Sequence, residues 1–572
     1  MLSNSYNFKR EYATRSFNTV YASFDIWKGI KFASTFSYDF VMNKSRAWKD
    51  PRTSDGDDDN GRFSKDYNDI TNMTWSNILT YQTKIKKKHN LDLLAGYEIN
   101  SKESDGLGTT ISNFARWDKP EVNNGVVYQS MGGSNSTTRI VSYITRANYD
   151  YDNKYYLGAS WRTDGSSRLA RENRWGNFWS LSGAWRVSSE SFMKPLQNWL
   201  SDLKLRVSYG VNGTLPSSYY GYMGLSSLTS NYNDNPGITQ SQLENKELTW
   251  ETNYNFNSGI DLGFFDNRLN VTFEYYVRTT KNLLYSRPLS LATGFSSYLA
   301  NIGKLQNKGY ELEIRSTNIE TKDFRWSTSL NLGHNANKIL KLDGDLKQVT
   351  SGTSIHKVGL PYSTYYMIEF AGIDPADGEP MFYKNTTDEN GNLNKETTKD
   401  PRSAEKVILQ CADPTITGGL GNSISYKWFD LNFNVNFSFG AWNYDGAAGK
   451  LEHGGDGTLN IPIYYRKRWQ KEGDETSIER FVVGRSISMT DYATTRRLYS
   501  GDYVRLKNLT FGFTLPKTWT RKVGIDNIRL YASGNNLLTW AAYDYIDPES
   551  GSSPSWDTPP MRTYTFGLEV KF

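Results

Sequence analysis

The sequence FDLNFNVNFSF, residues 429–439, decides the fold class, because apolar and polar side chains alternate along it without interruption. A β-strand points successive side chains to opposite faces. The apolar face carries Phe429, Leu431, Phe433, Val435, Phe437 and Phe439. The opposite face carries Asp430, Asn432, Asn434, Asn436 and Ser438. This pattern predicts a strand with lipid on its apolar side and water on its polar side.

The same alternation recurs along the whole chain and predicts about seventeen strands, most of them about ten residues long or longer. Strands of soluble sheets are usually nearer about 5–6 residues. Further clear examples lie at 30–40, 179–187, 269–277 and 564–572. Strands of this length and pattern are typical of an all-β, antiparallel transmembrane barrel.

The connections between the predicted strands alternate between short and long. Short ones are expected at 27–29, 84–89, 150–154, 265–268 and 427–428, and long ones at 41–69, 103–137, 211–250, 335–415 and 441–501. The moderate connection at 188–202 contains Met193–Leu196, which could form a short helix. Outer-membrane barrels have short periplasmic turns and long extracellular loops, whereas a jelly roll or propeller has no reason to sort its loops in this way.

Composition agrees with a barrel and excludes a helical membrane protein. The mean hydropathy is -0.65 and 37% of the residues are hydrophobic, while the longest apolar runs reach only a few residues. A membrane helix needs about 20 apolar residues, whereas barrel strands are apolar on one side only. A single cysteine, Cys411, excludes an internal disulfide framework. The net charge of +5 is small for 572 residues, so nucleic acid is not an expected partner.

Several motifs appear in a specific order along the chain. They are Tyr155–Arg168, Asn173–Gly176, Ala184–Val187, Asp202–Gly210, Leu248–Glu251, Gly259–Phe265, Asn307–Glu311, Gly372–Pro375, Gly501–Leu509 and Gly534–Leu538. Their order and spacing resemble the SusC/RagA-like branch of TonB-dependent transporters, clearly over about 155–572 and more diffusely before it. The resemblance implies a barrel of about 22 strands, a plug domain inside it and an N-terminal segment that engages TonB.

The resemblance also implies partners and cargo, namely a SusD-like surface lipoprotein, the TonB complex, outer-membrane lipid, and glycan oligomers or peptides. Bacterial single-chain barrels have even strand numbers, the first strand begins by about Asn18, and no export signal precedes it. We therefore expect residues 1–572 to be a barrel domain that is incomplete at its N-terminus. The plug, the TonB-contacting segment and about the first five strands of 22 are expected to be absent.

The long loops carry aromatic side chains that are candidates for cargo contact, because aromatic faces can stack on sugar rings. They are Trp117, Tyr219, Tyr220, Tyr222, Tyr365, Tyr366, Trp442 and Trp556. Trp and Tyr are equally expected in the girdles at the two membrane edges. The final strand, with Tyr564, Phe566, Leu568, Val570 and Phe572, ends the chain on an aromatic residue. The family resemblance implies that the assembly machinery reads such a strand.

Sequence reasoning finds no catalytic or cofactor site. Asp55, Asp57 and Asp59 faintly resemble a calcium loop with Gly61 and Asp66, but Asn60 replaces the required glycine and a solvated acidic loop is the better interpretation. Residues 374–379, with Asp374, Asp377 and Glu379, are first a Pro/Gly turn and second a cation site.

Paired carboxylates such as Glu311 and Glu313 lie on one face of a predicted strand. They indicate a polar lumen wall rather than a glycosidase, which needs its two carboxylates across a cleft. The sequence as a whole predicts a nutrient importer of the outer membrane and not an enzyme. Two alternatives stay open: a secreted carbohydrate-binding or adhesive β protein, and a passive porin.

Overall fold

The computed structural model describes the chain in two compact units. One comprises Met1–Trp185, Ser208–Asn255 and Thr280–Ile302, and the other comprises Arg186–Val207, Phe256–Thr279 and Gly303–Phe572. The described residues are 5–233, 235–342, 344, 346–389, 391–455, 460–484, 492–543, 545–550 and 560–572. No helix among them is long and apolar enough to cross a membrane.

Seventeen strands form one antiparallel sheet, which confirms the predicted number and fold class. The first seven are β1 (Phe8–Trp27), β2 (Ile30–Lys49), β3 (Arg62–Ile85), β4 (His89–Phe114), β5 (Gly125–Tyr151), β6 (Tyr155–Ser166) and β7 (Trp175–Arg186). The next three are β8 (Leu200–Thr214), β11 (Glu251–Phe264) and β12 (Leu269–Lys281). The last seven are β15 (Lys304–Glu320), β16 (Phe324–Lys341), β24 (Ile416–Tyr426), β25 (Phe429–Phe439), β28 (Tyr503–Thr514), β29 (Asn527–Ala541) and β30 (Thr563–Lys571).

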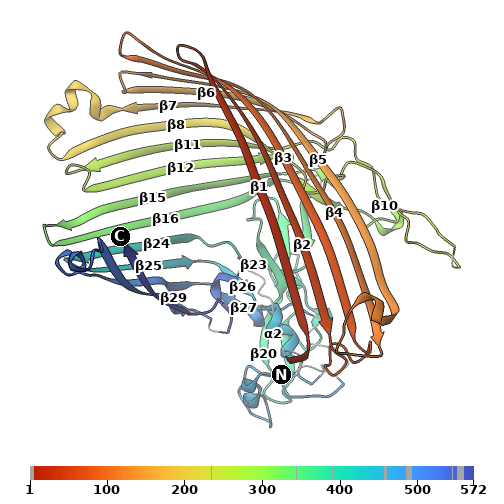
Figure 1. Cartoon of the computed structure of the whole chain (residues 1–572). Coiled ribbons are helices and arrows are strands. Elements are labelled where there is room, and N and C mark those ends of the chain that lie inside the picture. Colours follow the sequence, from red (N-terminus) through yellow and green to blue (C-terminus); the bar gives the residue numbers. More distant parts are fainter. Residues whose placement is uncertain are drawn as a thin grey trace. The chain divides into compact units, whose positions relative to one another are not determined.

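Strands β1 to β5 are much longer than a membrane crossing requires, and Figure 1 shows them side by side in red and orange. They have 20 to 27 residues, whereas about ten span a bilayer. The predicted loops 41–69 and 103–137 were therefore too long: the loops are 50–61 and 115–124. Beyond the membrane, water meets both faces of a strand, so the alternation fades while the backbone ladder continues.

The short turns lie where the sequence places them. Asp152 and Asn153, between β5 and β6, both have positive φ values of 54° and 53°. Two such residues make the tight turn whose twist matches that of the flanking strands. The connection between β7 and β8 holds the 3-10 helices η2 (Val187–Ser189) and η3 (Ser191–Leu196), which confirms the predicted short helix.

The long loops contain short elements of their own. The strands are β9 (Leu225–Ser227), β10 (Thr239–Gln242), β13 (Leu284–Pro288), β14 (Ser297–Asn301), β17 (Gln348–Ser351), β18 (Ser354–Lys357), β19 (Thr364–Ile368), β20 (Phe370–Ile373), β21 (Pro380–Tyr383), β22 (Thr397–Thr398), β23 (Lys406–Cys411), β26 (Trp442–Tyr444) and β27 (Leu498–Ser500). The helices are η1 (Val122–Asn124), η4 (Leu291–Thr293), η5 (Pro401–Ser403), α2 (Gly446–Leu451), η6 (Ile463–Lys467), η7 (Thr495–Arg497), α3 (Lys517–Thr520), η8 (Arg521–Val523) and η9 (Pro548–Ser550). In the second unit, β17, β18, β19 and β23 form a four-stranded sheet.

Strand β25 pairs with β24 along its whole length and with β28 over residues 429–438, with one bulge between Asn434 and Val435. The register keeps its apolar and polar side chains on opposite faces. Leu431 pairs with Ile424 of β24 and Phe511 of β28. Val435 pairs with Leu420 and Leu506 in the same way. The apolar row of β25 thus continues across its neighbours, and the same register continues its polar row.

None of the six apolar side chains of β25 is buried, so no second layer of protein covers this face among the described residues. Phe429 and Phe439 are 42% and 40% exposed. On β30, Phe566 is 82% and Phe572 90% exposed. Lipid contact by these residues and the assembly role of β30 stay predictions.

We predict that Phe433→Arg lowers insertion stability by about 2–4 kcal/mol, because a charge near the middle of the lipid face must leave water. The matched control is Asn434→Arg on the polar face of the same strand, which should have a far milder effect. The fraction of protein that keeps its heat-resistant folded migration in outer-membrane extracts measures both. Equal losses for the two variants would contradict the facing assignment.

Candidate functional site

Polar side chains line one face of the sheet in the second unit, in rows that the strand register fixes. The first row runs through Glu311, Gly333, Thr417, Ser438 and Tyr503 of β15, β16, β24, β25 and β28. The second row runs through Glu313, Asn331, Gly419 and Asn436 of β15, β16, β24 and β25. Asn436 and Ser438 belong to the polar set of β25, so both rows lie on the face opposite the Phe433 row.

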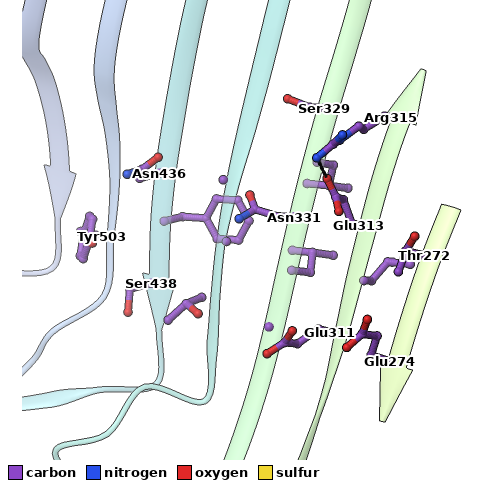
Figure 2. A pocket seen from close by; sticks show the side chains of 18 residues that line it. Thr272, Glu274, Glu311, Glu313, Arg315, Ser329, Asn331, Asn436, Ser438 and Tyr503 are labelled. Atoms are coloured by element: carbon purple, nitrogen blue, oxygen red, sulfur yellow. Dashed lines mark ion pairs between the residues drawn. The ribbon is translucent and has the colours of Figure 1, made fainter. Parts of the chain in front are cut away.

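A cavity of about 880 Å³ lies against this face and is lined by residues of β12, β15, β16, β24, β25 and β28 (Figure 2). Gly333 and Gly419 stand where a side chain would project into it. A Cβ atom at Gly419 would lie 2.8 Å from Oδ1 of Asn331 and 3.5 Å from Oδ1 of Asn436. We call this hollow the wall cavity.

Sequence reasoning placed Glu311 and Glu313 on one face of a strand, and the structure confirms this for β15. Both residues line the wall cavity. The other lining residues, such as Asn331 and Tyr503, were not singled out. The sequence signal that could have identified them is the polar set of positions in each alternating strand. Sequence alone does not say which residues of different strands face each other, because register is a property of the assembled sheet.

Carboxylates hold two arginines at and beside the wall cavity. Arg206 of β8 donates to Asp261 of β11 through Nε at 2.9 Å and to Glu274 of β12 at 2.6 Å. Arg315 pairs with Glu313 on the same face of β15 at 2.5 Å, as the dashed line in Figure 2 shows. The Arg206 contacts cross strands, and the Arg315 pair joins neighbouring positions of one face. Arg206 compensates one of its two carboxylates, so that group keeps one negative charge.

Arg505 of β28 is 1% exposed and holds the loop that follows β29. Its guanidinium contacts Asp547 at 2.6 Å and Glu549 at 3.0 Å. Lys507 of the same strand also pairs with Glu549 at 2.7 Å. Since Arg505 pairs with Asn436 in the register, residues 547–549 are fixed beside the wall cavity.

A buried ion cluster joins the described segments 445–453, 463–479 and 495–497 between β25 and β28. Glu479 is 0% exposed and accepts from Tyr465 Oη at 2.9 Å and from Arg496 at 2.5 Å. Glu452, 6% exposed, contacts Arg497 at 3.4 Å and Arg496 at 3.6 Å. Burial, together with the carboxylate of Glu479, raises the pKa of Tyr465 and keeps its hydroxyl a donor. This cluster, which we call the loop ion core, was not predicted.

In the first unit, the candidate aromatic residues differ in their accessibility. Trp117 is 45% exposed, with the Arg52 guanidinium 5.6 Å from its ring centre. Tyr219 is half-buried, and Arg168 lies 4.4 Å from its ring centre. Tyr220 accepts a hydrogen bond from the backbone of Thr137 at 2.9 Å.

Tyr219 and Tyr220 lie edge to face, with ring centres 6.5 Å apart. Tyr222 packs against a buried apolar cluster around Leu248 and Trp250. Trp117 and Tyr219 thus keep accessible ring surface for stacking, whereas Tyr222 has a packing role.

In the second unit, the structure corrects one candidate. Tyr365 is 3% exposed and sits in an apolar cluster with Met367 and Leu498, so its ring is not available to a ligand. Its hydroxyl donates to the backbone oxygen of Trp442 at 3.2 Å. Tyr366 and Trp442 are half-buried. Trp556 lies outside the described residues.

The two acidic segments considered as cation sites, 374–379 and 55–66, differ in their contacts. Lys399 bridges Asp374 at 2.6 Å and Asp377 at 2.7 Å, and so fills the place of a bound cation. Its ammonium group holds the pKa of both carboxyl groups below their usual range.

In the other acidic loop, Asp59 pairs with Arg62, and Asp66 lies within β3. Among the described residues, no group of three His, Cys, Asp or Glu side chains could hold a metal ion.

Comparison with known proteins places this wall in a family. The profile of a family described as TonB dependent receptor-like, beta-barrel, matches residues 2–537. TonB-dependent receptor P3 of Formosa agariphila is 32% identical over 96% of this chain and 57% of its own length. TonB-dependent receptor SusC of Bacteroides thetaiotaomicron is 30% identical over 76% of this chain and 44% of its own length. The chain thus spans about half the length of these relatives.

The same fold occurs in a solved transporter. The structure described as the RagAB peptide transporter has a TM-score of 0.89 and 27% sequence identity. The likeness covers 99% of this chain and 63% of that one.

We predict that Glu479→Leu loosens the loop of residues 440–502, because it leaves Arg496 buried without its nearest carboxylate. Removing one partner of a buried pair costs about 3–5 kcal/mol. Protease cleavage of this loop in intact outer membranes should become faster, while the strands stay folded by heat-resistant migration. Exposed Glu472 provides the control, since Glu472→Gln should leave the cleavage rate unchanged. An unchanged rate for Glu479→Leu would contradict a stabilising role of the loop ion core.

Proposed function

The chain belongs to the TonB dependent receptor-like β-barrel family of the outer membrane, and we propose that it forms the wall of a barrel through which nutrients are imported. Binding and translocation, rather than bond chemistry, are its proposed activity. One observation supports the proposal within the chain itself: the wall cavity lies on a polar face of the sheet, and among the described residues nothing buries the six apolar side chains on the opposite face of β25. A polar lumen behind a lipid-facing surface is the physical arrangement that passage of hydrophilic cargo requires.

Cargo and partners follow from the relatives. We propose glycan oligomers or peptides as cargo, since one relative is a peptide transporter and another is the receptor SusC. A SusD-like surface lipoprotein and the TonB complex are the proposed partners, because the family is described as TonB dependent. The strands that extend beyond the membrane, β1 to β5, offer the lipoprotein a firm surface.

A passive porin is the second candidate, because its wall also presents a polar face to water. The two differ in their energy supply: a TonB-dependent importer needs the proton motive force of the inner membrane, and a porin does not. A secreted carbohydrate-binding β protein would dissolve without detergent. Extraction of this protein only with detergent separates that third candidate from both barrels.

We predict energy-dependent uptake by cells that carry the full-length protein. Fluorescently labelled oligosaccharides and oligopeptides are offered, and cell-associated label is measured with and without a protonophore. At least one class should accumulate and fall to the level of a deletion strain when the protonophore is added. Uptake that continues at full rate with the protonophore would favour the porin and contradict the importer.

A further inference from the structure

The apolar face of β25 continues onto β16 and β15 in the second unit. Phe439 of β25 pairs with Ile416 of β24, Ile416 pairs with His334 of β16, and His334 pairs with Tyr310 of β15. Residues that pair directly across an antiparallel ladder lie on one face of the sheet. This row therefore belongs to the face that we expect to contact lipid, and a domain inside the lumen does not contact it.

The row of Tyr310 and His334 marks one edge of the apolar band. On β16 the band begins at Phe324, at the short turn, and ten residue steps separate Phe324 from His334. With a rise of about 3.3 Å per residue and a tilt of about 40°, these steps span about 25 Å along the membrane normal. The apolar band of outer-membrane barrels is about 25 Å tall. Because the row lies at the end of the long loops, we expect it at the extracellular edge of the membrane.

Two stacked rings and two lysines lie at this edge. The rings of Tyr310 and His334 have their centres 4.8 Å apart, and Tyr310 is 50% exposed. Lys308 lies two residues beyond Tyr310 on β15, and Lys338 lies four residues beyond His334 on β16, both toward the long loops and both exposed. Strand geometry places these two lysines on the lipid-contacting face, about 5 and about 10 Å outside the band.

The two lysines form a positive pair on this face. Lys308 pairs with Ala336 and Lys338 with Gln306 in the ladder, so the lysines are diagonal neighbours and neither has an acidic partner across from it. Among the described residues, no Asp or Glu oxygen lies within 4.0 Å of either ammonium group. Strand β16 has β15 along one side and β24 over residues 324–334 on the other (Figure 1). The free charge is therefore not the result of a strand at the edge of the sheet.

We propose that Lys308 and Lys338 bind the phosphate of a lipid headgroup in the outer leaflet of the membrane. Two neighbouring ammonium groups complement a phosphate and form charge-assisted hydrogen bonds with it. Lysines just outside an apolar band extend their side chains to the level of the headgroups. A phosphorylated glycolipid fits best, because its sugar ring can stack on the exposed ring of Tyr310 while its acyl chains follow the apolar face below. The inference rests on the lipid-facing assignment of this face and not on the import of cargo.

Lipid binding to the purified full-length protein in detergent tests this site. The probes are diphosphoryl lipid A, the same lipid after removal of both phosphates, and inorganic phosphate as a competitor, and native mass spectrometry measures the fraction of protein that retains the lipid during a titration. We expect diphosphoryl lipid A to bind about tenfold more tightly than the dephosphorylated lipid, because each lysine near a headgroup contributes to the binding of an anion. Excess inorganic phosphate should not displace the lipid, since it has no acyl chains to contact the apolar face.

Matched variants locate the binding on this face. Lys308→Gln and Lys338→Gln remove the charge and keep most of the side chain, and each should lower the affinity for diphosphoryl lipid A about fivefold. The double variant should bind the two lipids equally. Lys322→Gln, in the exposed short turn at the other end of the same two strands, should leave the affinity unchanged. Heat-resistant migration of every variant shows that the barrel is folded before the affinities are compared.

Four outcomes would overturn the proposal: an unchanged affinity in the double variant, an equal loss in Lys322→Gln, equal binding of the two lipids by the unaltered protein, or displacement of the lipid by inorganic phosphate. If the double variant keeps its affinity for lipid A but no longer copurifies with the SusD-like lipoprotein, the face is a protein interface and the proposal is wrong. Energy-dependent uptake is measured separately. A protein that shows the lysine-dependent lipid preference without any uptake would contradict import and support the headgroup site.

Discussion

A peptide group in the core of a bilayer has no water to bond, and each unpaired amide or carbonyl costs several kcal/mol there. Strand β25 meets this constraint by pairing along its whole length with β24 on one side and over 429–438 with β28 on the other, where one bulge follows Asn434. Continuous pairing fixes register, and register fixes facing, because a slip of one residue would turn every side chain to the other face. The apolar row of β25 and the polar row behind it are thus two consequences of one ladder.

The wall cavity follows from the same ladder. Gly333 of β16 and Gly419 of β24 stand in rows whose other members are polar. Because these two positions have no side chain, the space between the side chains of β15 and β25 stays open. Register also decides which charges meet: Arg206, Asp261 and Glu274 come from three strands and form one group. The register partner of Glu311 on β16 is Gly333.

The loops of the second unit are held by a different interaction. They contain short strands and two small apolar clusters, around Met367 and around Phe382. Buried carboxylates and guanidinium groups also take part in their packing, as at Glu479 and Arg496. Such a cluster contributes specificity of arrangement more than net stability, because burying charge has a desolvation cost. Residues 547–549, held by Arg505, extend this ordering to the edge of the wall cavity.

The sequence by itself determined the seventeen strands, the short turns, the polar and apolar faces, and the placement of Glu311 and Glu313 on one wall. Period-two alternation is a local property, and it is strong wherever lipid meets one face and water the other. Only the tertiary structure decided how far β1 to β5 run beyond the membrane, that Tyr365 is a core residue, and that Lys399 bridges Asp374 and Asp377. These features depend on contacts between residues that are distant in the sequence. Where water meets both faces of a strand, the sequence has no apolar and polar alternation, so it does not indicate which partner a side chain contacts.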